Sequence, residues 1–155
     1  MRFTITSIFC LLLVSSLLLV ASVMAQSGPG EVTGNGTTSG TSGSADLVMK
    51  GQTYTATVTV STIDGPTEME DGSRQEKTSH RFVFADGSSF TTEDRMTMTP
   101  TSTPGMYKMT GISRIVEGTG DHANARGQLV LRGDMNMDKS EADWTVKGSI
   151  CSPCN

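Results

Sequence analysis

Strict alternation of side chains between residues 53 and 62 constrains this chain more than any other feature of its sequence. Tyr54, Ala56, Val58 and Val60 occupy every second position, and threonine or serine stands between them. Because successive side chains of a β-strand point to opposite faces, this pattern predicts a strand with one buried and one solvated face. Threonine is β-branched and tolerates water, so it suits the solvated face.

The same period of two recurs along the rest of the chain, and no segment favours a helix. Further strands are expected at 80–84, 90–98, 106–116, 128–132 and 142–150. Polar loops are expected at 64–76 and 134–141, and a proline-containing turn at 99–105. Closely spaced strands of this kind predict one all-β domain over residues 45–155, a small antiparallel barrel of six to eight strands, with a β-sandwich as the alternative.

The first 25 residues have the form of a secretory signal. Arg2 is their only charge, an apolar run follows it, and small residues precede a cleavage site after Ala25. An uncleaved membrane anchor is the competing interpretation, but the apolar run is at the short limit for a spanning helix. We therefore expect a signal peptide at 1–25, a secreted or periplasmic protein, and no membrane span after cleavage.

Residues 26–44 are mainly glycine, serine and threonine, with almost nothing apolar. Such a segment buries too little surface to offset its ordering entropy, so it is expected to be a flexible tether. The chain after cleavage holds 16 acidic and 11 basic residues, a formal charge of −5. This scattered acidic balance argues against a nucleic-acid partner, which requires a concentrated basic face.

A hairpin around Asp86 and Gly87 brings a histidine and a carboxylate together. A three-residue loop at 86–88 keeps the apolar residues of both strands on one face, whereas a two-residue loop does not. That register predicts that Arg81 faces Glu93 on the outside and that His80 faces Asp94 on the inside. A carboxylate beside an imidazole orients it and raises its basicity, so this pair is the candidate for catalysis, with a structural hydrogen bond as the alternative.

The large apolar side chains define a candidate ligand site, although they also serve as a core. A barrel that is incompletely filled would be lined by Tyr54, Phe82, Phe84, Phe90, Met96 and Trp144. Two M-x-M pairs, at 96–98 and 135–137, fit core packing or a pliable cavity, while exported thioethers can also bind Cu(I). No cofactor or metal ligand is predicted.

Two cysteines near the C-terminus, Cys151 and Cys154, are expected to form a disulfide in an exported protein. The loop that this disulfide closes is tiny, so it would add little stability. A redox role would require a helix beginning at the first cysteine, and one residue after Cys154 leaves no room for it.

Residues 115–127, IVEGTGDHANARG, resemble the GGTG-x-(F/Y)-x-x-A-x-G turn of allene oxide cyclase-like and dirigent-like β-barrels. Glu117 stands where the first glycine of that motif would be, and His122 where its aromatic residue would be. The resemblance implies an antiparallel barrel, of the allene oxide cyclase-like or lipocalin-like kind, whose interior holds a small apolar molecule. No catalytic residue of the family maps onto this chain.

The function expected first is therefore an exported binding barrel for a small apolar ligand. The alternatives are a cyclase or isomerase that uses His80 and Asp94, and a non-catalytic surface or matrix protein whose interior is simply filled.

Overall fold

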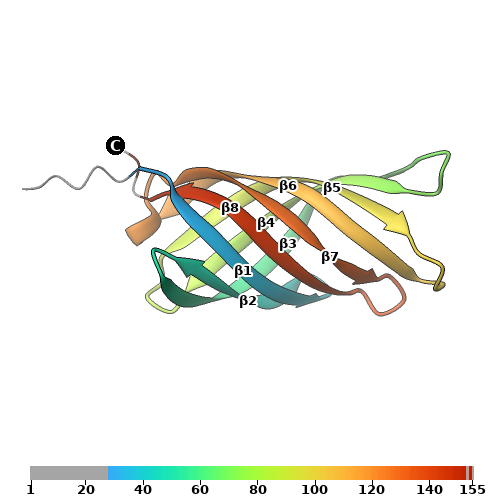
Figure 1. Cartoon of the computed structure of the whole chain (residues 1–155), viewed down its shortest axis with the longest axis horizontal. Coiled ribbons are helices and arrows are strands. Elements are labelled where there is room, and N and C mark those ends of the chain that lie inside the picture. The colour runs from blue at the N-terminus through green and yellow to red at the C-terminus, as the bar shows by residue number, and fades with distance from the viewer. Residues whose placement is uncertain (1–27, 153, 155) are drawn as a thin grey trace, which may run out of the picture.

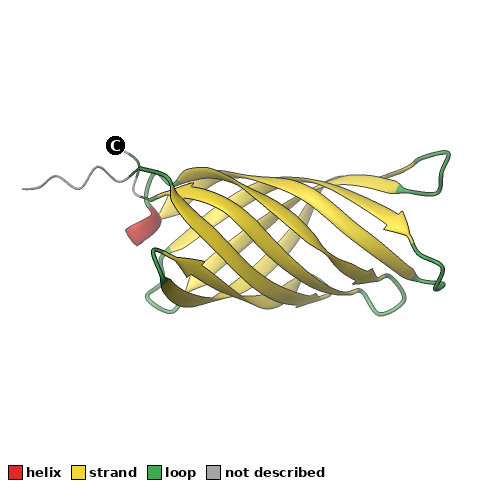
Figure 2. Cartoon of the chain, viewed as in Figure 1, coloured by secondary structure: helices red, strands yellow, loops and turns green. Residues whose placement is uncertain are grey.

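The computed structural model describes residues 28–152 and residue 154, so the expected signal peptide at 1–25 lies outside the described residues. The described chain consists of eight strands and one short 3₁₀ helix (Figures 1 and 2). Their bounds are β1 Gly30–Ser39, β2 Ser42–Met49, β3 Gln52–Glu68, β4 Arg74–Phe84, β5 Ser89–Pro100, β6 Met106–Thr119, η1 Gly120–His122, β7 Arg126–Asn136 and β8 Glu141–Cys151.

The strands form a closed antiparallel barrel in sequence order. Each strand pairs with the next one along the chain, and β1 pairs with β8 to close the sheet. The predicted all-β antiparallel barrel is confirmed, with a strand number at the upper limit of the expected range, and the alternative sandwich is wrong. Closure leaves no strand of the barrel without a partner on either side, which removes the edges of the sheet.

The barrel has two different ends, which Figure 1 shows at the left and right. The η1 end, at the left, carries η1, the turns at 50–51 and 85–88, the beginning of β1 and the end of β8. The β3–β4 end, at the right, carries the loops at 40–41, 69–73, 101–105 and 137–140. The outer parts of β3 and β4 extend the wall at this end, and residues 61–70 are all exposed there.

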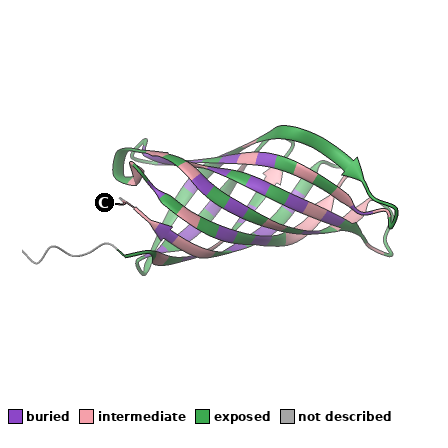
Figure 3. Cartoon of the chain, turned by 90° about the horizontal axis from the view of Figure 1, so that it is seen from above, coloured by how far each residue is buried: buried purple, intermediate pink, exposed green. Residues whose placement is uncertain are grey.

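Alternating burial along the strands separates the core from the outer wall, as the banding in Figure 3 shows. On β3, Ala56 and Val58 are buried while Thr55, Thr57 and Thr59 are exposed, as the alternation predicts. The core is continuous from strand to strand and contains Val32, Leu47, Phe82, Phe90, Ile115, Leu129, Trp144 and Val146 among others.

The predicted tether over 26–44 is wrong from residue 30 onward, because these residues form β1 and the start of β2. Both sides of β1 are hydrogen-bonded, one to β2 and the other to β8, so its backbone is satisfied without large side chains of its own. Gly34 and Gly36 leave interior space that the side chains of Leu47 and Trp144 fill. The neighbouring strands thus supply the apolar surface that the segment lacks.

The hairpin between β4 and β5 differs from the predicted register by two residues. Phe82 pairs with Phe90 and Arg81 pairs with Thr91, so Arg81 does not face Glu93. The connection is four residues long, since the Phe84 N–H donates to the Ser88 carbonyl and the Gly87 N–H to the Phe84 carbonyl. Because the period of a strand is two, a slip of two residues leaves every side chain on its predicted face.

Two loops are shorter than the sequence suggests. The expected loop over 64–76 is mostly strand, because β3 continues to Glu68 through two register shifts and β4 begins at Arg74. The expected loop over 134–141 shrinks to 137–140. Polar residues occupy these strand ends because the wall of the barrel is solvated there, so composition alone does not distinguish them from loop residues.

The Trp144 ring occupies space that its neighbours in the sheet leave open. Trp144 pairs with Gly133 on β7 and with Gly36 on β1, and Gly36 pairs in turn with Ala45. A Cβ atom at Gly36 would overlap the indole. The ring reaches across the interior and meets Phe82 edge-on, with ring centroids 6.2 Å apart.

Candidate functional site

A pocket of about 870 Å³ opens at the η1 end of the barrel, and we call it the end pocket. Its apolar part comes from three buried side chains, Met49, Phe84 and Ile150, which lie at the ends of β2, β4 and β8. Tyr54 and His122 add two rings to its wall. The polar side chains that line it include Lys50, Asp86, Ser88, Asp121 and Ser152.

Tight turns place the polar groups around the end pocket. Lys50 and Gly51 both have positive φ, of 52° and 76°, as the two central residues of a twisted hairpin turn require. Asp86 accepts hydrogen bonds from the backbone N–H and the hydroxyl of Ser88, at 2.9 and 2.7 Å. These two bonds lower the pKa of Asp86 below its ordinary value, so its carboxylate is ionised at neutral pH.

His122 lies between two phenylalanine rings and the C-terminal segment. Its ring packs on Phe84 and Phe90, with centroids 4.6 and 5.7 Å apart. Its Nδ1 lies 2.9 Å from Ser152 Oγ, and that hydroxyl donates to the Asp121 carbonyl at 3.0 Å. Because the serine proton goes to the carbonyl, Nδ1–H donates to Oγ. Nε2 is then the acceptor nitrogen of the ring.

Burial lowers the pKa of His122 below its ordinary value of 6.5. Asp86 and Asp121 oppose this shift and Lys50 reinforces it, all three through their charges. Neutral imidazole at pH 7 therefore offers the pocket one hydrogen-bond acceptor beside an apolar floor.

Replacing His122 by glutamine is expected to make stability less sensitive to acid. The folded pKa is lower than the unfolded one, so as pH falls below about 6.5 the unfolded state takes up a proton first and stability is lost. The free energy of unfolding from urea titrations should therefore drop less between pH 7.5 and 5.5 in His122→Gln than in the parent. Both proteins share all other titrating groups, so equal drops would contradict the burial of this imidazole.

The residues predicted to line a cavity are divided by the structure. Tyr54 and Phe84 line the end pocket and meet edge-on, with centroids 6.2 Å apart. The remaining four, Phe82, Phe90, Met96 and Trp144, belong to the packed core and do not line the end pocket. Phe82 and Phe90 stack at 4.7 Å and form part of the core beneath the pocket.

The predicted histidine–carboxylate pair is present, although through a different register. His80 pairs with Thr92 and Asp94 pairs with Thr78, so the two are diagonal neighbours on the inner face. His80 Nδ1 lies 2.7 Å from Asp94 Oδ2, and the Thr78 hydroxyl donates to the same oxygen at 3.3 Å. The Asp94 side chain is fully buried. This arrangement orients the imidazole, but neither partner lines the end pocket.

The C-terminal segment completes the rim of the end pocket. Cys151 and Cys154 are joined in a disulfide, as the sequence suggests. Ser152, which lies between them, holds His122 and also accepts a weak hydrogen bond from the Lys50 ammonium through its carbonyl oxygen, at 3.4 Å. The disulfide thus lies beside the pocket.

Sequence reasoning missed most of the end pocket. His122 was visible only as a departure from an aromatic position in the motif at 115–127, and Met49 and Ile150 looked like ordinary core residues. The Asp86-Gly87 pair was recognised as a turn but not as part of a site. The only available signal was that these turns all connect strands at the same end of an up-and-down barrel.

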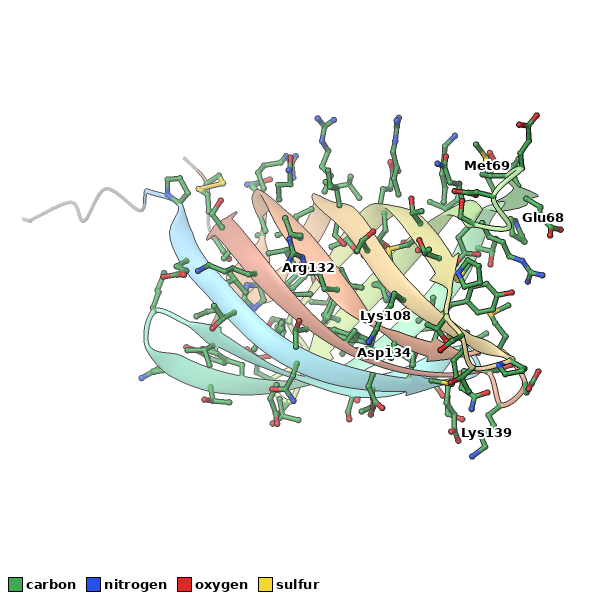
Figure 4. The ribbon with its side chains drawn as sticks, turned by 45° about the vertical axis from the view of Figure 1, so that its right-hand side comes forward. Glu68, Met69, Lys108, Arg132, Asp134 and Lys139 are labelled. Atoms are coloured by element: carbon green, nitrogen blue, oxygen red, sulfur yellow. A yellow bond between two sulfur atoms is a disulfide. The ribbon has the colours of Figure 1, made fainter. Side chains whose placement is uncertain are left out.

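A second, more open hollow of about 690 Å³ lies on the outer wall over β6, β7, β8 and β1. Figure 4 shows Lys108, Arg132 and Asp134 on this wall, and Lys108 Nζ lies 2.5 Å from Asp134 Oδ1. Opposite charges compensate one another here. Within the described residues, no three histidine, cysteine, aspartate or glutamate side chains form a group suited to a metal ion.

No helix in the described part of the chain is long and apolar enough to cross a membrane. No protein-family model, curated protein or solved structure matches the chain significantly. The resemblance of residues 115–127 to allene oxide cyclase-like and dirigent-like barrels therefore stays a sequence-based expectation.

Proposed function

We propose that this chain is an exported barrel that binds a small, mainly apolar molecule in the end pocket. The observation that carries the proposal is the pocket itself, whose volume of about 870 Å³ lies within the usual range for small-molecule sites. Its apolar floor of Met49, Phe84 and Ile150 suits a hydrocarbon or aromatic group. The location outside the cytoplasm rests on the signal-like segment at 1–25.

The polar groups of the pocket would orient the ligand, while the apolar floor would provide most of the binding free energy. His122 offers an acceptor nitrogen, Lys50 a cation and Asp86 a carboxylate, all at the rim. A few polar groups above an apolar floor are typical of sites that fix the direction of a ligand. The ligand class that fits is therefore a molecule with an apolar body and one polar end.

Filling the end pocket is expected to abolish binding without unfolding the barrel. Ala123 lines the pocket, so Ala123→Trp is expected to fill part of it with an indole. With N-phenyl-1-naphthylamine as an apolar fluorescent probe, we expect the dissociation constant to rise at least tenfold. The matched control is Ser102→Trp, which adds the same ring to an exposed loop at the β3–β4 end.

Intact mass of the protein from its native source then identifies the ligand. Extra mass that is present under native conditions and lost on denaturation would belong to a bound molecule. The denatured mass also reports whether the chain starts at Gln26. If the probe binds both tryptophan variants equally and no mass is lost, the end pocket is not a ligand site, and a surface protein with a filled interior becomes the better description.

A further inference from the structure

Methionine is distributed unequally between the two ends of the barrel. The described residues contain eight methionines, and seven of them lie in the half nearer the β3–β4 end, on β5, β6 and β7 and in the neighbouring loops. The exception is Met49, at the end pocket. The rest of the core consists of leucine, valine, isoleucine, alanine and aromatic residues instead.

Four of these side chains form what we call the methionine cluster: Met96, Met98, Met109 and Met135. Met98 on β5 and Met109 on β6 are direct partners, and both are buried. Direct partners on one face have Cβ atoms about 4.5–5.5 Å apart, and diagonal neighbours lie about 7–8 Å apart, within reach of long side chains. Met135 on β7 is such a diagonal neighbour of Met109, because Met109 pairs with Gly133.

Glycine makes room for the cluster. Gly111 pairs with Met96, and the Met96 sulfur lies where a Cβ atom of residue 111 would be. The thioether of Met96 is therefore turned toward β6, the strand that carries Met109. Three strands thus place methionine side chains in one region of the interior.

A carboxylate and several partly exposed methionines lie near the methionine cluster. Glu76 on the inner face of β4 pairs directly with Met96, and its side chain is only partly exposed. Met106 and Met137 are partly exposed, and Met69 is 42% exposed on the β3–β4 loop at this end (Figure 4).

Packing alone does not require thioethers at this end. Leucine fills a core with better-defined rotamers, and methionine exposed outside the cytoplasm is open to oxidation. Thioether sulfur does, however, bind soft monovalent cations, of which Cu(I) is the biological example. From the convergence of the methionine cluster beside Glu76, we propose that the β3–β4 end binds one Cu(I) ion, with Met98 and Met109 as its central ligands.

The test compares Cu(I) affinity in proteins without thiols. The parent for this experiment is the chain after cleavage at Ala25, which lacks Cys10, and it carries Cys151→Ser and Cys154→Ser because a reduced cysteine would bind Cu(I) by itself. Cu(I) is added without oxygen in competition with bicinchoninate, whose copper complex is coloured. We expect one Cu(I) per chain and at least a tenfold weaker affinity in Met98→Leu/Met109→Leu.

Met49→Leu is the matched control, because it makes the same substitution at the other end and should leave the affinity unchanged. Exchange of methionine for leucine nearly conserves volume, so circular dichroism should show both variants folded. Addition of Ag(I) should shift the methionine methyl resonances of residues 96, 98 and 109 but not that of residue 49. The proposal fails if the parent takes no Cu(I) from the competitor, or if the double variant binds as tightly as the parent. Neither result bears on the end pocket.

Discussion

Trp144→Ala is expected to lower the free energy of unfolding by about 3–5 kcal/mol, as removal of a buried aromatic side chain does when its surroundings relax only partly. Trp144 is 4% exposed, and its sheet neighbours Gly133 and Gly36 carry no side chains that could fill the space. The hole would therefore extend over three strands. Urea unfolding followed by circular dichroism measures the loss, because the variant no longer contains a tryptophan.

Two further variants separate packing from other causes. The indole Nε1 has no hydrogen-bond partner among the described residues, so Trp144→Phe should lose less than half as much stability as the alanine variant. Gly36→Ala should lower the free energy of unfolding more in the parent than in the Trp144→Ala background, because its Cβ overlaps the indole only in the parent while the overlap with the Ser44 carbonyl remains in both. Additive effects of the two substitutions would show that this glycine is not shaped to the ring.

Asp94→Ala is expected to lower the free energy of unfolding by about 3–5 kcal/mol, because removal of one member of a buried pair leaves the other without a partner. The Asp94 side chain is fully buried and accepts hydrogen bonds from His80 and Thr78. Without it, both donors remain in the core with no acceptor. The same urea titration applies, and here Trp144 fluorescence reports on the core.

A double substitution tests whether His80 and Asp94 act as a unit. His80→Phe/Asp94→Leu removes both polar groups, and buried pairs replaced by apolar residues of similar volume often lose little stability. We expect the loss in free energy of unfolding of the double variant to be about 0.5–3 kcal/mol smaller than the sum of the losses in the two single variants. Purely additive losses would mean that the 2.7 Å contact contributes no coupling.

The strand pattern of this chain was readable because the barrel alternates between an apolar interior and a solvated wall. The alternation at 53–62 predicted the first part of β3 and the burial of Ala56 and Val58, whereas Tyr54 on the same face is exposed beside the end pocket. The register of the β4–β5 hairpin was not readable, because loops of three and four residues differ in hydrogen bonding that side-chain pattern does not report. His80 and Asp94 still met, since a slip of two residues preserves the face.

The first strand and the end pocket were beyond sequence reasoning for one physical reason. Both depend on what lies next to a residue in the closed sheet rather than along the chain. Gly34 and Gly36 are typical of a flexible tether by composition. Their place in β1 is explained only by Leu47 and Trp144, whose side chains fill the space beside them. His122 acquires a role only because Phe84 and Ser152, far away in sequence, lie against it.

From the pairing of β1 with β8 we also expect an order of events during folding, with this ladder forming last. Every other strand pair in the barrel joins consecutive strands and can form as a local hairpin. The β1–β8 pair instead joins the first strand to the last. Contacts between such distant segments are slow to form because loop closure has to precede them. Until β8 pairs with β1, the partly formed sheet has two unpaired edge strands, and such edges can pair with other chains and aggregate. Formation of the β1–β8 ladder therefore competes with aggregation during folding. We expect substitutions in β1 and β8 to change the refolding yield more than the free energy of unfolding.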